Sequence, residues 1–225
     1  MNAELIEYLK QFLSENRIAK FDRNIALRMN HLQLVLENIY QPHNASAVLR
    51  SADCFGVQYI HAIEKKNKYI VNEDIAMGSG SWITLERHHQ HENNTVACLN
   101  SLKEKGFRVV ATSPHKNDKE LHDFDVTQKF ALVFGTEQEG ISEDVMQMAD
   151  EFIKIPMFGF TESFNISVCA ALCMYELTGK IRSQPEIEWQ LDKEQKEIIY
   201  LDWLRNSIRN VDLIEKEFFA ARQQK

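Results

Sequence analysis

Short apolar runs alternate with helical patterns through the middle of the chain, and this alternation constrains the fold more than any other feature of the sequence. The apolar runs have the length of strands and predict strands at Leu32–Glu37, Tyr59–Ile63, Arg108–Thr112, Phe130–Phe134 and 152–155. Segments with helical spacing of apolar residues lie between them, at 45–55, 95–105, Glu143–Met148 and 165–177. This order predicts an α/β fold with a mostly parallel sheet.

Polar residues and glycines mark the ends of the expected helices. Asn44 and Ser142 stand where an N-cap side chain accepts hydrogen bonds from the first helical turn. Gly56, Gly106 and Gly179 stand where helices end, because glycine adopts the left-handed conformation of a helix C-terminus without strain. These signals indicate the helix boundaries independently of the apolar spacing.

Both ends of the chain carry helical patterns without the strand alternation. We expect an N-terminal helical extension over residues 1–31, a central domain over 32–180 and a C-terminal helical extension over 181–225. Apolar residues recur through 193–222 and predict a packing surface. The polar, glycine-containing stretch 65–82 is expected to be a loop.

The composition is that of a globular protein. A chain of 225 residues with 44% hydrophobic side chains is able to bury a core, which excludes a mainly disordered protein. The longest nearly unbroken apolar run, 166–175, is about half of the roughly 20 residues that a membrane span needs. The N-terminal pattern lacks the apolar centre of a signal peptide, so we expect a cytoplasmic protein with no membrane partner.

The cysteines and a histidine cluster do not have the spacing of a metal site. Cys54, Cys98, Cys169 and Cys173 form no C-x-x-C pair and are expected to be small buried side chains. The three histidines within residues 88–91 lack the i, i+4 spacing of zinc ligands on a helix and are expected at a solvated edge or in a loop. The sequence therefore predicts no metal.

The net charge of −7 is unevenly distributed along the chain. The acidic excess belongs to the central segment, whereas residues 17–31 contain a single acidic side chain. The basic residues of that segment are Arg17, Lys20, Arg23 and Arg28. They are candidate contacts for phosphate groups, or else a solvated helix face.

Three junctions that follow expected strands are rich in polar side chains. Ligands bind outside the carboxyl ends of parallel strands, so these junctions are the first candidates for a functional site. They are 38–53 with His43, Asn44 and Arg50, 134–142 with Gly135 and Glu137, and 155–167 with Ser163 and Asn165. The second junction has two glycines at the spacing of a phosphate-binding loop but lacks the Lys-Ser/Thr pair, which excludes a P-loop.

Each junction taken singly also has a structural interpretation. Asn44, and either Ser163 or Asn165, are able to cap helices, and Arg50 is able to pair with Asp53 one turn away. A nicotinamide-binding Rossmann enzyme is excluded because no G-x-G-x-x-G follows the first expected strand.

Taken together and in this order, the three junctions resemble the motifs of the SpoU family of knotted RNA 2′-O-ribose methyltransferases, from about residue 32 to residue 177. The Asn and Arg of the first family motif are matched by Asn44 and Arg50. Gly135 and Glu137 match the second motif, and Ser163 and Asn165 match the third.

The resemblance implies a deep C-terminal trefoil knot that binds S-adenosylmethionine, a homodimer, and methylation of a guanosine ribose in the D-loop of tRNA. Ribosomal RNA is the alternative substrate, and a non-catalytic RNA-binding protein on the same fold is the alternative class. The implied cofactor contacts are Thr112, Gly135, Glu137, Ile155, Met157, Ser163 and Asn165. The implied catalytic residues are Arg50, Asn44, Glu137, Ser163 and Asn165, and the expected RNA contacts are Arg17, Lys20, Arg23, Arg28, His43 and Arg50.

The role of Arg50 needs separate treatment. The resemblance gives Arg50 the activation of the ribose hydroxyl, but a guanidinium stays protonated far above neutral pH. Its forked donors fit a phosphate, so contact with the ribose-phosphate is expected. The hydroxyl proton passes either to Arg50, with assistance from a phosphate, or to water.

Overall fold

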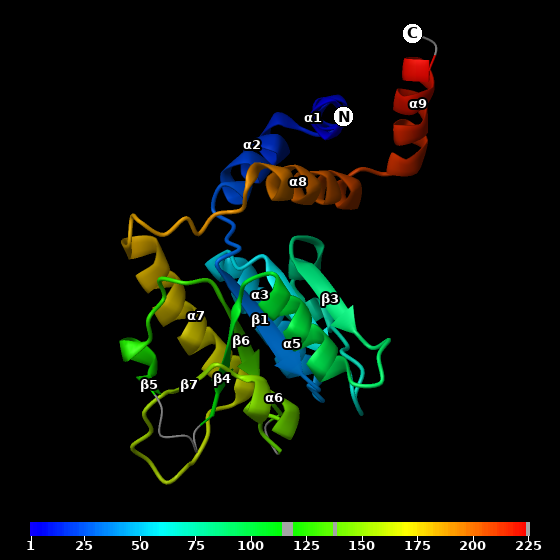
Figure 1. Cartoon of the computed structure of the whole chain (residues 1–225). Helices are drawn as coiled ribbons and strands as arrows, with labels where there is room; N and C mark the ends of the chain where they lie inside the picture. The colour runs from blue at the N-terminus through cyan, green and yellow to red at the C-terminus, as the bar shows by residue number, and fades with distance from the viewer. Residues whose placement is uncertain (114–118, 137–138, 224–225) are drawn as a thin grey trace. The chain divides into compact units, whose positions relative to one another are not determined.

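The computed structural model describes the backbone of residues 1–113, 119–136 and 139–223, which form two compact units. The first, Met29–Trp189, is called the core unit and contains a sheet with helices on both faces (Figure 1). The second, called the terminal unit, is helical and is built from Met1–Arg28 and Gln190–Lys225.

Seven parallel strands form the sheet of the core unit, in the order β3-β2-β1-β6-β4-β7-β5. They are β1 (Leu32–Glu37), β2 (Tyr59–Ile63), β3 (Thr84–His88), β4 (Arg108–Thr112), β5 (Lys119–Glu120), β6 (Phe130–Phe134) and β7 (Glu151–Lys154). Strands β1, β2, β4 and β6 have their predicted bounds, and β7 begins and ends one residue early. The prediction of an α/β fold with a parallel sheet is confirmed.

The apolar pattern does not predict β3 or β5. β3 is an edge strand, and its residues are partly exposed, so it lacks the apolar run of the central strands. β5 has only two residues. The stretch 65–82, expected to be a loop, contains helix α4 (Glu73–Ala76) and the 3-10 turn η1 (Ser79–Ser81). A second 3-10 turn, η2 (Leu121–Asp123), follows β5.

The longer helices of the core unit are α3 (Pro42–Phe55), α5 (Asn94–Glu104), α6 (Glu143–Met148) and α7 (Ile166–Ser183). Ser142 caps α6 as predicted, and Gly56 and Gly106 have the predicted positive φ, 75° and 81°. The predicted cap at Asn44 is wrong, because α3 begins at Pro42, whose fixed φ suits the first helical position. Gly179 does not end α7, which continues so that Ile181 reaches the core.

The two faces of the sheet are covered by different helices. α3 and α7 cover one face, where Leu34, Ile60 and Leu132 are fully buried. α5 and α6 cover the other face, where Val35 and Val133 are fully buried. Successive residues of a strand point to opposite faces, so β1 directs its even-numbered residues to the α3/α7 face and its odd-numbered residues to the α5/α6 face.

The terminal unit consists of α1 (Asn2–Lys10), α2 (Glu15–Ile25), α8 (Lys193–Ser207) and α9 (Val211–Gln223). The Phe21 ring packs edge-on against Tyr200 and Trp203, with centroids 5.8 and 5.5 Å apart. Asn210 has a positive φ of 57°, so the apolar pattern over 193–222 belongs to two helices. Over the described part of the chain, none of the helices has the length and apolarity needed to cross a membrane.

Candidate active site

A cleft of about 490 Å³ opens at the carboxyl ends of β4, β6 and β7, the position where open parallel sheets bind ligands. We call it the larger cleft. The predicted cofactor contacts that line it are Thr112, Gly135, Ile155, Met157 and Ser163. The second and third junctions, far apart in the sequence, thus contribute to one cleft, whereas no residue of the first junction is among its described lining.

A smaller cleft of about 230 Å³ lies beside the first and includes Asn44. Thr136, Glu139 and Ile166 line both clefts, so two ligands bound in them would be neighbours. Asn38, directly after β1, lines this cleft, and its backbone adopts the left-handed conformation, with φ 54°. Its side-chain oxygen accepts hydrogen bonds from the backbone N–H groups of residues 66 and 67, at 3.0 and 2.9 Å.

The second motif forms a tight loop that requires glycine at position 135. Thr136 and Gly140 exchange two backbone hydrogen bonds, of 2.9 and 3.0 Å. A Cβ atom at Gly135 would lie 2.1 Å from the carbonyl oxygen of Gly140, so a side chain at this position would open the loop. Glu137, which carries predicted catalytic and cofactor roles, lies outside the described residues.

The first and third motifs are joined by a side-chain hydrogen bond between residues 121 positions apart. Asn165 Nδ2 donates to Asn44 Oδ1 at 3.1 Å, and Asn44 Nδ2 donates to Gln41 Oε1 at 3.1 Å. The Oδ1 atom of Asn165 caps α7 by accepting from the backbone and hydroxyl of Ser167, at 2.9 and 2.6 Å. Asn165 therefore has the capping role and also links two motifs, directly before Ile166, which lines both clefts.

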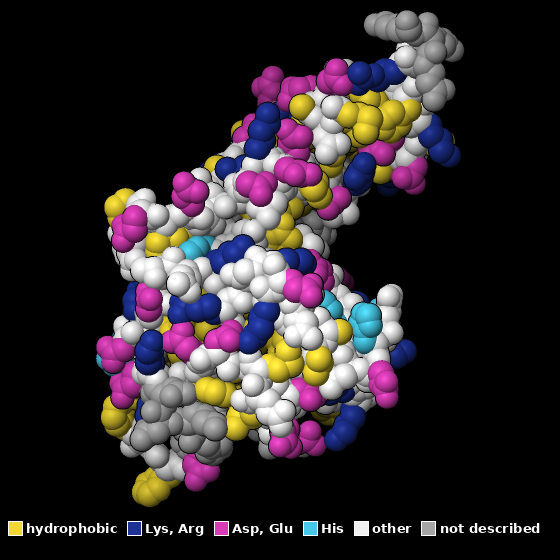
Figure 2. Space-filling view, viewed as in Figure 1, with side chains coloured by type: hydrophobic (Ala, Val, Ile, Leu, Met, Phe, Trp, Pro, Cys, Tyr) yellow, Lys and Arg dark blue, Asp and Glu magenta, His cyan; other side chains and the backbone are white. Residues whose placement is uncertain are grey.

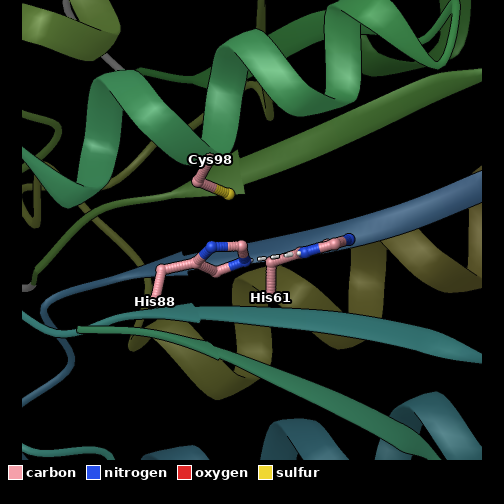
Figure 3. A group of neighbouring side chains, drawn as sticks. All are labelled: His61, His88 and Cys98. Atoms are coloured by element: carbon pink, nitrogen blue, oxygen red, sulfur yellow. Dashed lines mark hydrogen bonds between the residues drawn. The ribbon is translucent and has the colours of Figure 1, made fainter. Parts of the chain in front are cut away.

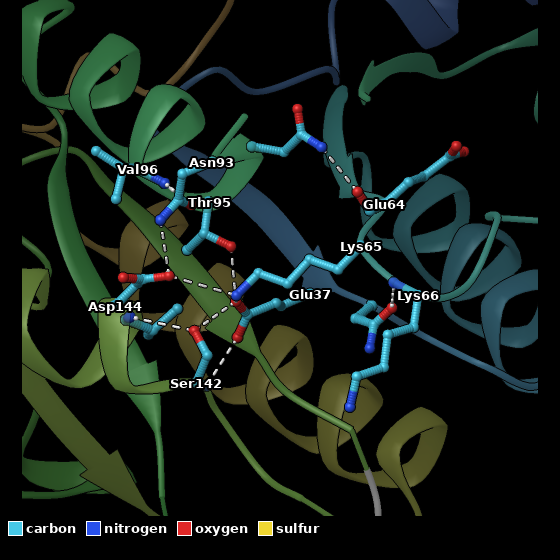
Figure 4. A network of polar contacts seen from close by, with 12 residues as sticks. Glu37, Glu64, Lys65, Lys66, Asn93, Thr95, Val96, Ser142 and Asp144 are labelled. Carbon is cyan, nitrogen blue, oxygen red and sulfur yellow. Dashed lines mark hydrogen bonds and ion pairs between the residues drawn. The ribbon is translucent and has the colours of Figure 1, made fainter. Parts of the chain in front are cut away.

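Glu37 is a site residue that the sequence analysis missed. Its carboxylate, 2% exposed, anchors the end of the second motif by accepting from the backbone N–H of Ser142 at 2.9 Å and from its hydroxyl at 2.6 Å. Thr95 also donates to it at 2.8 Å, and Lys65 Nζ lies 3.0 Å away (Figure 4). The available signal is a single carboxylate at the end of a mostly apolar strand.

Arg50 and His43 are both exposed on α3. Neither is among the described lining residues of the two clefts. Arg50 lies six residues beyond Asn44, which is about 9 Å along the helix axis. Within one chain the structure brings Asn44 and Asn165 together but does not bring Arg50 to them.

The four predicted basic contacts on the N-terminal segment differ in accessibility. Lys20 and Arg23 are exposed, and Arg17 is half-buried over the Phe21 ring. Arg28 is 4% exposed and its guanidinium lies 5.2 Å from the centre of the Trp203 ring, so its burial contradicts the prediction that it contacts RNA. On the face seen in Figure 2, basic and acidic side chains are interspersed.

The cysteines are partly as predicted. Cys98 and Cys173 are buried, Cys169 is half-buried, and Cys54 is exposed on α3, contrary to the prediction. Burial raises the pKa of Cys98 to about 12. Cys169 and Cys173 line the larger cleft, and a hydrogen bond between their thiols lowers the pKa of Cys169 and raises that of Cys173.

Comparisons with known proteins agree with this geometry. The SpoU rRNA Methylase family model matches residues 31–175. A tRNA (guanosine(18)-2′-O)-methyltransferase of Borreliella burgdorferi is 37% identical over 210 residues, which cover 93% of this chain and 94% of the relative.

Solved structures show the same similarity. The TrmH/SpoU tRNA modifying enzyme of Aquifex aeolicus matches with a TM-score of 0.76 and 30% identity over 87% of this chain and 98% of that chain. The SpoU methyltransferase AviRb of Streptomyces viridochromogenes, in complex with the cofactor AdoMet, shares the fold, with a TM-score of 0.58 and 23% identity over 72% of this chain and 65% of that chain. With the family model covering more than half of its length and its motifs gathered around two adjoining clefts, the chain belongs to the SpoU methylase family.

Proposed function

We propose that this protein methylates the ribose 2′-hydroxyl of a guanosine in the D-loop of tRNA with S-adenosylmethionine, at the position 18 named for its relative. The observation that carries the proposal is that two clefts share lining residues, with the hydrogen bond from Asn165 to Asn44 next to Ile166, one of the residues that they share. Transfer between two bound molecules requires that their reacting groups lie side by side, and adjoining sites supply that proximity.

The larger cleft is suited to the methyl donor. Gly135 lets backbone approach backbone where a Cβ would not fit, and Ile155 and Met157 offer apolar surface for the adenine. Thr112 and Ser163 add polar groups to its lining, and Asn165 directly precedes the lining residue Ile166. Glu137 lies outside the described residues, and its role in cofactor binding remains part of the proposal. S-adenosylmethionine supplies an electrophilic sulfonium methyl group. The cleft residues would bind and orient it beside the smaller cleft.

The ribose would bind in the smaller cleft, where Asn44 positions it. The hydroxyl oxygen would accept the methyl group that S-adenosylmethionine supplies, and the hydroxyl proton would pass to water or to Arg50 with the help of a phosphate. A guanidinium is protonated at neutral pH, so Arg50 binds the neighbouring phosphate and orients the nucleotide. His43, exposed on the same helix, is a second contact for RNA.

A homodimer would bring Arg50 to the reaction. Val168, Leu172 and Tyr175 of α7 are 46%, 39% and 71% exposed and follow one another at helical spacing, so they form an apolar stripe suited to a second copy. We propose that Arg50 of the partner subunit completes each site.

The remaining predictions concern the chain ends and the path of the backbone. We propose that residues 1–31 and 181–225 act as extensions of the 32–180 domain that contact tRNA, with Arg17, Lys20 and Arg23 as the phosphate contacts. We also propose that the segment from β7 into α7 is threaded as the trefoil knot of the family. Such threading is rare in proteins, and it would make the walls of the larger cleft rigid.

The test is methyl transfer from labelled S-adenosylmethionine to unmodified tRNA transcripts, followed by mapping of the modified ribose. We expect a single labelled guanosine in the D-loop. Transfer to ribosomal RNA without transfer to tRNA would contradict the substrate assignment. No transfer to any RNA, with intact binding of the methyl donor, would favour the non-catalytic alternative.

Replacement of Arg50 by alanine tests the mechanism. We expect turnover to fall by about 100-fold or more while S-adenosylmethionine binding is retained, because Arg50 orients the RNA and does not line the larger cleft. Lys105→Ala, at an exposed cation of the core unit outside the described lining of both clefts, is the control and should retain turnover. Full activity of Arg50→Ala would remove Arg50 from the reaction.

A further inference from the structure

Three metal-ligating side chains meet on the α5/α6 face of the sheet, apart from both clefts. They are His61 of β2, His88 of β3 and Cys98 of α5 (Figure 3). One ligand atom of each lies within 4.8 Å of those of the other two. His61 and Cys98 are 1% and 0% exposed, and His88 is half-buried. Of the three histidines predicted at a solvated edge, His89 and His91 are exposed and His88 is not.

The register of the parallel strands creates this cluster. His61 pairs with Glu86 and Ile63 pairs with His88, and residues two apart on a strand point to the same face. His61, Glu86 and His88 therefore share the face covered by α5, from which the Cys98 side chain points toward the two imidazoles (Figure 3). The spacing within residues 88–91 does not reveal the site because its other members come from different elements.

A chain of hydrogen bonds assigns the proton positions on His61. Gln33 Nε2 donates to Asn30 Oδ1 at 2.6 Å, which orients the Gln33 amide. Its oxygen then accepts from His61 Nε2 at 2.8 Å. The Nδ1 atom of His61 therefore carries no proton, and its lone pair accepts a hydrogen bond from His88 Nε2 at 3.0 Å. An imidazole whose second nitrogen donates to a fixed carbonyl group is the usual arrangement of a histidine metal ligand.

We propose that His61 Nδ1, His88 Nε2 and Cys98 Sγ bind a zinc ion, and that the Glu86 side chain, which lies outside this group of atoms, turns inward to supply the fourth ligand. Two imidazoles, a thiolate and a carboxylate are typical zinc ligands. Glu86 Oε2 lies 3.4 Å from His61 Nδ1. Tetrahedral zinc holds its donor atoms roughly 3.3 to 3.7 Å apart. The two imidazole nitrogens are already near this spacing, and the thiolate reaches it by a small side-chain movement.

Binding moves two protons. Without metal, His88 Nε2–H donates to His61 Nδ1. With zinc bound, the His88 proton resides on Nδ1, and the Cys98 thiol proton is released to solvent. The ion would tie the edge strand β3 to β2 and α5. It lies outside the described lining of both clefts and takes no part in methyl transfer.

Cobalt titration of the chelator-treated full-length chain tests the proposal, because thiolate ligation gives cobalt a sulfur-to-metal charge-transfer band. We expect one cobalt ion per chain, with this band, displaced by zinc. Cys98→Ala should abolish the band and His88→Asn should weaken zinc binding at least tenfold. Gln33→Leu should weaken it about 10- to 100-fold through the loss of ligand orientation. Cys54→Ala and His89→Asn are the matched controls and should bind like the wild type.

Thermal unfolding gives an independent readout. Zinc should raise the Tm of the wild type and of His89→Asn but not that of His88→Asn, because only a folded chain with the site intact gains from binding. His88 is half-buried at the sheet edge, so His88→Asn should fold even if Cys98→Ala does not. Cobalt binding without a sulfur band, or equal binding by His88→Asn and the wild type, would overturn the proposal.

Discussion

Strand β1 buries side chains of different polarity on the two faces of the sheet. On the α3/α7 face β1 contributes Leu32, Leu34 and Leu36, all buried among other apolar side chains. On the α5/α6 face the same strand contributes Gln33 and Glu37, buried beside Val35. Each of these two polar side chains is hydrogen-bonded to a group that another element supplies.

This difference separates the roles of the two faces. Apolar burial is non-directional and stabilises the fold in proportion to area, so the β1 side chains on the α3/α7 face mainly contribute stability. Buried polar groups require specific partners, so the α5/α6 face fixes the positions of particular atoms. Glu37 fixes the second motif in this way, and Gln33 fixes an imidazole.

The largest expected loss of stability follows from Leu34→Ala on the α3/α7 face. Leu34 is 0% exposed, and a leucine truncated in a packed core loses about 2–5 kcal/mol of unfolding free energy. Urea unfolding followed by circular dichroism measures this, with Leu213→Ala at a 60% exposed position as the control. S-adenosylmethionine affinity of the folded variant should be unchanged. A loss of stability below about 1 kcal/mol would break the comparison.

A smaller loss of stability, combined with a functional effect, is expected for Glu37→Gln on the α5/α6 face. The amide has one oxygen where the carboxylate accepts with two, so the anchor of Ser142 is weakened. We expect about 1.5–3 kcal/mol less unfolding free energy. Calorimetric titration should give about tenfold weaker S-adenosylmethionine binding, equal to about 1.4 kcal/mol.

The control for Glu37→Gln is Glu143→Gln, one residue beyond Ser142 and exposed on α6. It makes the same chemical change without touching the anchor and should leave both quantities unchanged. If Glu37→Gln lowers stability but leaves cofactor affinity intact, Glu37 only packs the fold, and the proposed difference between the faces is lost.

The smallest effect concerns His31, which precedes β1 and packs against Phe130, one of the buried apolar residues on the α3/α7 face. Burial lowers the pKa of His31, whose ring also contacts the carbonyl oxygen of Val126 at 2.7 Å. The folded-state pKa of His31 lies below its unfolded-state value of about 6.5. The contribution of neutral His31 to the unfolding free energy is therefore complete above about pH 6.5 and is lost as the pH falls from there through the folded-state pKa.

His31→Gln should therefore flatten the decline in unfolding free energy below about pH 6.5, whereas His91→Gln, at an exposed histidine, should not. Denaturant titrations at a series of pH values measure the difference between the two slopes. Equal slopes in the wild type and in His31→Gln would show that the apolar side of the sheet has no pH-sensitive group at this position.

The strands differ in how far sequence could predict them. β1, β2, β4 and β6 are buried on both faces and are apolar almost throughout, so their bounds follow from the sequence. The edge strand β3 has no such run and was missed. Similarly, the residues of the three motifs could be named from the sequence, but the burial of Arg28 depends on an aromatic ring of a distant helix.

The sequence by itself determined the parallel α/β architecture, the central strands and the family motifs, because burial periodicity and short motifs are local properties of the chain. Only the tertiary structure decided which motif residues meet. The Asn44–Asn165 bond, the Glu37 anchor and the histidine–cysteine cluster each join elements far apart in sequence. Such contacts depend on strand order and register, which the packing of the whole core unit fixes and no local pattern encodes.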